Sequence, residues 1–151
     1  MRKLIVTRIE GRLAGLVSDE VSEILPMPEV TPLPEALPGV RGAAFVGGRL
    51  TTVVDTASLL GESGNGDSLE LLLRMAPPHD HLALPISSVE FVLPFEPLKL
   101  KEEEQTGMWR GVYPWGENFI NVIQLPGVAE ELTGAVSSAL HVHTAGREHG
   151  A

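Results

Sequence analysis

The chain has 151 residues, of which 43% are hydrophobic, and it carries a formal charge of −9. This hydrophobic content suffices for the folded core of one domain or of two small interdependent halves, and it argues against a disordered chain. The acidic balance argues against nucleic acid and anionic membranes as partners, and the absence of cysteine excludes disulfides, thiol nucleophiles and cysteine metal sites.

The first residues, MRKLIVTRIEGR, begin with basic side chains but contain too short an apolar run for a signal peptide. No other apolar run reaches the length that a bilayer requires. We therefore expect a cytoplasmic protein with no direct membrane insertion.

The first half of the chain is predicted to form five short strands. Residues 4–9, 12–17 and 21–25 are rich in β-branched or large apolar residues, and turn formers separate them. Five prolines from Pro26 to Pro38 exclude a helix or a central strand in that span. Two further strands, 40–46 and 49–55, are joined by a Gly-Gly dipeptide that suits a tight hairpin. Short strands at this spacing are typical of small barrels.

The second half repeats the first. Residues 12–28 align with residues 80–96 at an offset of 68, and residues 40–55 align with residues 109–124 at an offset of 69. The glycine-rich residues 61–67 separate the two copies and are predicted to be a linker. The period is too long for a solenoid repeat, so duplication of one unit fits better. A unit of about 70 residues has a marginal core alone, so we expect the copies to pack together.

We therefore predict an all-β fold of two five-stranded β-barrel subdomains that are related by internal duplication and share a core. The first subdomain spans residues 3–61 and the second spans residues 68–132. Residues 133–151 are predicted to be a C-terminal helix or tail, partly disordered, after a short helix that starts near Pro126.

Asp55 is the one candidate for catalysis. The stretch TTVVDTASLLG is close to the strand and turn that carry the catalytic aspartate of an aspartic protease. Such an enzyme needs two carboxylates that share a proton, and the repeat places Gln124 at the equivalent position. A dyad therefore requires a homodimer, and Ala57 stands where the turn normally needs glycine. We favour Asp55 as a strand-end residue, with a dimeric aspartic hydrolase as an alternative.

Two histidine pairs, His79/His81 and His141/His143, have the spacing that puts two imidazoles on one face of a strand. Two imidazoles do not make a zinc site without further ligands, so surface histidines are the better interpretation. We predict no catalytic residue, no metal site and no cofactor.

The span VSEILPMPEVTPLPEALPGVRGAAFVGGRLTTVVDTASLLG, residues 21–61, resembles the CheW-like chemotaxis adaptor family of bacteria. The shared pattern is Val-x-Glu-Ile, a proline-containing loop, a hairpin, two apolar residues before aspartate, and a closing Leu-Leu-Gly. The resemblance extends more loosely from Lys3 to Leu132, so residues 1–151 are predicted to be a single CheW-like domain. It implies two five-stranded barrels around a shared core.

The function that the resemblance implies is signalling without catalysis. Family members couple the cytoplasmic tips of chemoreceptors to the regulatory domain of the histidine kinase CheA. The alternative is a binding module of the same fold in a chemosensory system for pilus-driven twitching motility, with altered partners.

The resemblance places a partner surface on the first barrel. Its residues are Val21, Glu23, Ile24, Arg41, Gly42 and Gly47. A valine beside an acidic residue can give an apolar anchor with a polar rim, and a glycine lets a partner approach the backbone.

The hairpin departs from the family. There the usual residues are Asn-Leu-Arg-Gly, whereas here they are Phe45-Val46-Gly47-Gly48. Glycine thus stands in place of an arginine that the resemblance links to receptor and kinase coupling. A member without it need not activate a kinase in the ordinary way.

Overall fold

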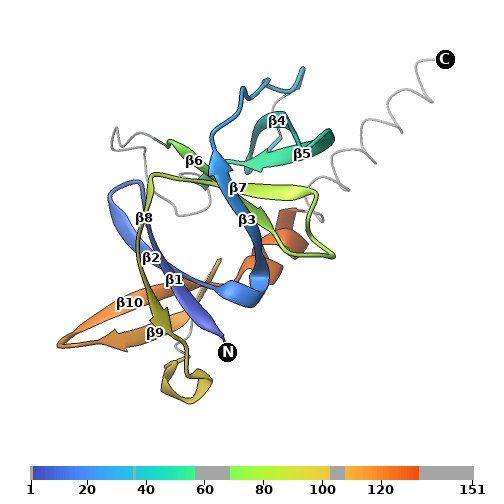
Figure 1. Ribbon diagram of the computed structural model, residues 1–151. Helices are drawn as coiled ribbons and strands as arrows, with labels where there is room; N and C mark the ends of the chain where they lie inside the picture. The colour runs from blue at the N-terminus through green and yellow to red at the C-terminus, as the bar shows by residue number, and fades with distance from the viewer. Residues whose placement is uncertain (1, 36, 57–68, 103–107, 133–151) are drawn as a thin grey trace.

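The computed structural model describes residues 2–35, 37–56, 69–102 and 108–132. Within these ranges the chain forms ten β-strands, two 3₁₀ turns and one short helix (Figure 1). None of the helical residues described makes a segment long and apolar enough to cross a membrane. The all-β prediction is confirmed.

Each half of the chain supplies five strands. The first half forms β1 (Lys3–Ile9), β2 (Arg12–Val17), β3 (Val21–Pro26), β4 (Val40–Val46) and β5 (Arg49–Val54). The second half forms β6 (Leu71–Met75), β7 (Leu82–Ile86), β8 (Ser88–Pro94), β9 (Trp109–Trp115) and β10 (Asn118–Ile123). The five strands predicted in the first half are all present, with ends that differ by at most one residue. Residues 125–132 form the expected short helix, whereas the predicted linker 61–67 and tail 133–151 lie outside the described residues.

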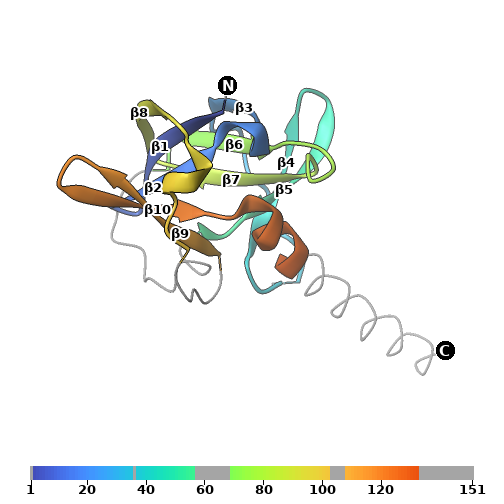
Figure 2. The same cartoon turned by 90° about the horizontal axis from the view of Figure 1, so that it is seen from below.

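The strands form two sheets of five, and each sheet takes strands from both halves (Figures 1 and 2). Sheet A has the order β8-β1-β2-β10-β9, and sheet B has the order β3-β6-β7-β5-β4. The first hairpin of each half therefore lies between strands of the other half. The predicted division into residues 3–61 and 68–132 describes the repeat units, and the sheets cut across it.

The two sheets match in register, including their irregularities. The β1–β8 ladder shifts between Val6 and Thr7, and the equivalent β3–β6 ladder shifts between Val21 and Glu23. The parallel contacts match too, since β5 pairs with β7 through Val53 and Ala83, while β10 pairs with β2 through residues 122 and 15. A bulge and a parallel register at equivalent positions confirm the internal duplication.

The expected closed barrels are wrong in one detail. In neither sheet do the described residues form a strand ladder between the two edge strands. Instead, one isolated bridge joins the segment that follows one edge strand to the opposite edge strand. These bridges are Thr31 to Ala43 in sheet B and Lys101 to Val112 in sheet A. The physical reason lies in the prolines that follow β3. Proline has no backbone N–H, so residues 26–34, with four prolines, cannot form a continuous ladder with β4.

The shared core that the duplication predicted lies between the sheets. Its largest cluster joins buried residues of both sheets to the helix, and it includes Leu16, Leu73, Leu84, Ile123, Val128 and Leu132. Two smaller clusters lie within the individual sheets, around Val6 in sheet A and Val53 in sheet B. The helix thus packs its apolar side onto the junction between the sheets (Figure 2).

Candidate functional site

The six residues of the predicted partner surface all lie on sheet B, at its two opposite edges. Val21, Glu23 and Ile24 belong to edge strand β3, whereas Arg41, Gly42 and Gly47 belong to edge strand β4 and its turn. The structure therefore brings them together as two groups. Between the two groups run β6, β7 and β5.

The β3 group combines partly buried apolar residues with an acidic neighbour. Val21 and Ile24 are partly buried and pack against the shared core. Glu23 lies opposite Arg74 in the β3–β6 ladder, and its Oε1 forms an ion pair with Arg74 Nη1 at 3.1 Å. The Glu23 side chain remains about half exposed, at 47%. A partner that binds Glu23 therefore meets a carboxylate already engaged with an arginine.

Arg74 was not identified from the sequence, and it connects the two edges of sheet B. The residue is 8% exposed, and its Nη2 donates to the backbone carbonyl oxygen of Val46 at 2.8 Å. Through Glu23 on β3 and Val46 on β4, one guanidinium ties together the edges that no ladder joins. We call these three residues the ionic strap.

Sheet A has an apolar counterpart at the equivalent positions. The repeat places Val6, Phe91 and Trp115 where sheet B has Arg74, Glu23 and Val46. The rings of Phe91 on β8 and Trp115 on β9 lie 4.7 Å apart between centroids. The two sheets therefore hold their open edges together by different means, ion pairing in sheet B and aromatic contact in sheet A.

Packing within the chain requires glycine at position 42. A Cβ at this position would overlap the carbonyl oxygen of Thr31, and the equivalent Gly111 meets Lys101 in the same way. Thr31 and Ala43 exchange two backbone hydrogen bonds at this place, of 2.8 and 2.9 Å. The close approach of the proline-rich segment to β4 thus explains the glycine; contact with a partner there stays a prediction.

Gly47 lies at the turn beside the strap. Gly47 and Gly48 have φ values of +58° and +78°, which suit a two-residue hairpin of type I′. A Cβ added to Gly47 would meet little except Arg74 Nη2, at 4.0 Å. The position where the family usually has arginine therefore borders the guanidinium of Arg74.

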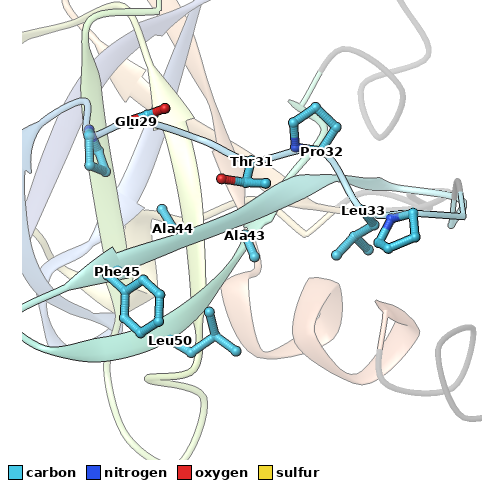
Figure 3. A pocket seen from close by; sticks show the side chains of 10 residues that line it. Glu29, Thr31, Pro32, Leu33, Ala43, Ala44, Phe45 and Leu50 are labelled. Atoms are coloured by element: carbon cyan, nitrogen blue, oxygen red, sulfur yellow. The ribbon is translucent and has the colours of Figure 1, made fainter.

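A groove of about 500 Å³ opens beside the same hairpin (Figure 3). One wall is the hairpin, with Ala43, Phe45 and Leu50, and the other is the proline-rich segment that includes Glu29 and Leu33. Phe45 and Leu50 are cross-strand partners and are 72% and 65% exposed. Exposed apolar side chains gathered in a groove are a feature of binding surfaces. No pattern in the sequence pointed to this groove.

Glu20 lies where the two halves meet. Its Oε2 is 3.6 Å from Arg110 Nη2, while its other oxygen is buried without a hydrogen-bond partner among the described residues. Burial raises the pKa of the Glu20 carboxyl, and the attraction of Arg110 and a hydrogen bond from the Leu125 N–H oppose that rise. This carboxylate therefore contacts the second half of the chain at both β9 and the helix.

The catalytic and metal candidates lie in structural positions. Asp55 directly follows β5, and its N–H donates to the Gly39 carbonyl; the N–H of Gln124 donates to Met108 at the equivalent place. Asp55 is thus the strand-end residue that the repeat indicated. His79 and His81 lie in the β6–β7 turn, and no metal-binding group of three ligands occurs among the described residues.

Comparison with known proteins gives one family and one type of structure. Residues 3–72 match the sequence model of the CheW-like domain, a range that contains all six residues of the predicted surface. The search of curated proteins found no match. Among solved structures, the chain is similar to the scaffolding protein TtCheW from Thermoanaerobacter tengcongensis, with a TM-score of 0.73 and 19% identity over 82% of this chain and 84% of that one.

Proposed function

We propose that the chain is a member of the CheW-like family, whose sequence model matches residues 3–72, and that it is a coupling adaptor of a chemotaxis-type signalling system. CheW-like proteins are non-catalytic scaffolds, so the chain is not an enzyme and the aspartic hydrolase alternative is set aside. The proposed partners are the regulatory domain of a CheA-type histidine kinase and the cytoplasmic tip of a chemoreceptor. A cytoplasmic location is part of the same proposal.

One observation carries the proposal most directly. The segment that matches the CheW-like domain, residues 3–72, also contains all six residues that we propose as the partner surface on β3 and β4. On β3, half-buried Val21 offers an apolar contact beside the half-exposed carboxylate of Glu23. An apolar centre with a polar rim is the common composition of a specific interface. We assign kinase and receptor binding to this edge of sheet B.

The test is binding of the full chain to the isolated kinase regulatory domain and to a receptor-tip fragment, measured by calorimetry. Signalling contacts of modest area have micromolar affinity, about −8 kcal/mol. The change Val21→Asp places an unpaired charge in the contact and should cost about 2 kcal/mol, roughly a thirtyfold loss of affinity. Thermal unfolding of the variant verifies that it is folded.

The matched control is Val92→Asp on edge strand β8 of sheet A, where the valine is 49% exposed. It introduces the same charge away from the proposed surface and should bind as the wild type does. If Val21→Asp is folded and binds both partners with unchanged affinity, the partner surface is not on β3.

The hairpin supports a second candidate, a CheW-fold module of a pilus-type chemosensory system with altered partners. Its basis is Gly47, where the family usually has arginine. This candidate predicts no binding to a flagellar-type CheA regulatory domain by the wild-type chain, together with binding to the kinase of a pilus-type system.

A further inference from the structure

We propose that the groove between the β4–β5 hairpin and the proline-rich segment binds an extended segment of a partner protein, with a lysine or arginine of that segment over the ring of Phe45. This site lies beyond the proposed function and does not depend on it. Three features of the groove support the assignment: its apolar wall, its open backbone edge and its charge.

The hairpin wall offers an apolar contact surface. Phe45 and Leu50 face each other across the β4–β5 ladder and are 72% and 65% exposed, and Ala43 and Ala44 form the floor beside them (Figure 3). Two large apolar side chains at one place exceed the scattered exposure that is ordinary on a protein surface. The wall therefore suits the apolar side chains of a bound segment.

The backbone edge of β4 is open at Phe45. The N–H and C=O of Ala43 point away from β5, because both bond to Thr31. Antiparallel strands alternate in this respect, so the backbone groups of Phe45 point the same way. No described residue bonds to them outside the ladder, since the proline-rich segment has already left β4 there. An extended segment can pair with this edge as an added strand.

The charge of the groove favours a cation. Glu29 is the one charged residue among its ten lining residues, and no described residue forms an ion pair with it. The chain as a whole carries −9. A basic segment would meet a favourable field and a carboxylate on the wall opposite the hairpin, whereas an acidic segment would be repelled.

In sheet A the chain itself places a cation over an aromatic ring of the hairpin, at the position that the repeat aligns with Leu50, the cross-strand partner of Phe45. There the Nζ of Lys101 lies 5.2 Å from the ring centroid of Phe119, the exposed aromatic residue of the β9–β10 hairpin. The Lys101 backbone bridges to Val112, just as Thr31 bridges to Ala43 in sheet B. In sheet B this position holds Thr31 and Pro32, which carry no charge. No cation of the described residues lies over the ring of Phe45, so this ring is open to a lysine or arginine of the bound segment.

The probe is a synthetic octapeptide of alternating lysine and valine, titrated into the full ¹⁵N-labelled chain at physiological salt. We expect amide shifts confined to residues 43–50 and 29–33. Phe45→Ser removes both apolar and cation–π contact and should weaken binding about tenfold, while Phe45→Leu, which keeps only the apolar contact, should weaken it about threefold. Glu29→Gln should weaken peptide binding about threefold and make the peptide affinity less dependent on salt concentration.

The controls separate this groove from peptide binding elsewhere on the chain. Phe119→Ser removes an exposed aromatic residue of the sheet A hairpin and should leave peptide affinity within about twofold. Val21→Asp, which tests adaptor binding, should do the same. An octapeptide of alternating glutamate and valine should not bind. Equal binding of the acidic peptide, equal loss in Phe119→Ser, or the same amide shifts on concentrating the chain without peptide would each overturn the proposal, the last in favour of a second copy of this chain.

Discussion

At the scale of single residues, Glu20 shows how position decides what a carboxylate does. Glu20 directly precedes β3 and Glu90 lies within β8, and the environment moves their pKa values in opposite directions. Burial raises the pKa of Glu20 above its ordinary 4.5. A hydrogen bond from Arg8, with a second from Ser88, lowers the pKa of Glu90 below the same value. The two should therefore affect the pH dependence of stability with opposite signs.

The change Glu20→Gln tests this sign. Because the folded-state pKa of Glu20 is raised, its contribution to stability is fully present below pH 4.5 and is lost as the pH rises through the folded-state value. The glutamine variant lacks this loss. Urea unfolding at a series of pH values should therefore show the variant gaining in free energy of unfolding relative to wild type between acidic and neutral pH.

The matched variant Glu90→Gln should behave in the opposite way. Its lowered pKa stabilises the fold above pH 4.5 and ceases to do so as the pH falls through the folded-state value. The variant should thus be less stable than wild type at neutral pH, and equal to it at strongly acidic pH. Parallel pH profiles for the two variants would refute the roles assigned to both carboxylates.

At the scale of elements, the ionic strap explains how sheet B holds together without closing. Arg74 is buried on β6 and reaches both edge strands, through Glu23 and through the Val46 carbonyl. The Arg74→Met change keeps an unbranched apolar side chain but removes a charged hydrogen-bond donor, so it should lower the free energy of unfolding by about 1–3 kcal/mol. Hydrogen exchange of residues 45–50 should rise.

Glu23→Gln should have a smaller effect, about 0.5 kcal/mol, because Glu23 is half exposed and its attraction to Arg74 is screened by solvent. Exchange in the β9–β10 hairpin serves as the internal control, since sheet A uses the contact of Phe91 with Trp115. Unchanged hydrogen exchange at residues 45–50 in Arg74→Met would show that the ionic strap does not hold the edges of sheet B together.

At the scale of the whole molecule, the sequence predicts the strands and the duplication but not their arrangement. Apolar periodicity and turn residues locate each strand, because both are local properties. A linear repeat does not say which copy a hairpin pairs with, so the exchange of hairpins between the sheets is visible only in the structure. The single bridges in place of ladders follow from prolines that the sequence does show, although the strand spacing by itself favours closed barrels.

The candidate site was predictable to a similar degree. The resemblance led to β3 and β4, and the match to the CheW-like domain covers both strands. It gave no role to Arg74, although an arginine within the apolar strand LLLRM is a signal of a buried ion pair. From the resemblance, Gly42 was expected to let a partner approach the backbone. In the structure, the backbone that lies against Gly42 is that of Thr31 in the same chain. Contacts between distant segments decide such roles, and one sequence does not reveal them.

The most direct test of the central claim, that this chain couples receptor to kinase, is co-sedimentation. Membrane vesicles carrying chemoreceptor cytoplasmic domains are mixed with the CheA-type kinase, with and without the chain, and the kinase in the pellet is measured. We predict that wild-type chain raises the sedimented kinase and that Val21→Asp does not. Kinase that sediments equally with and without the folded chain, for receptors and kinases of both flagellar and pilus type, would contradict the claim.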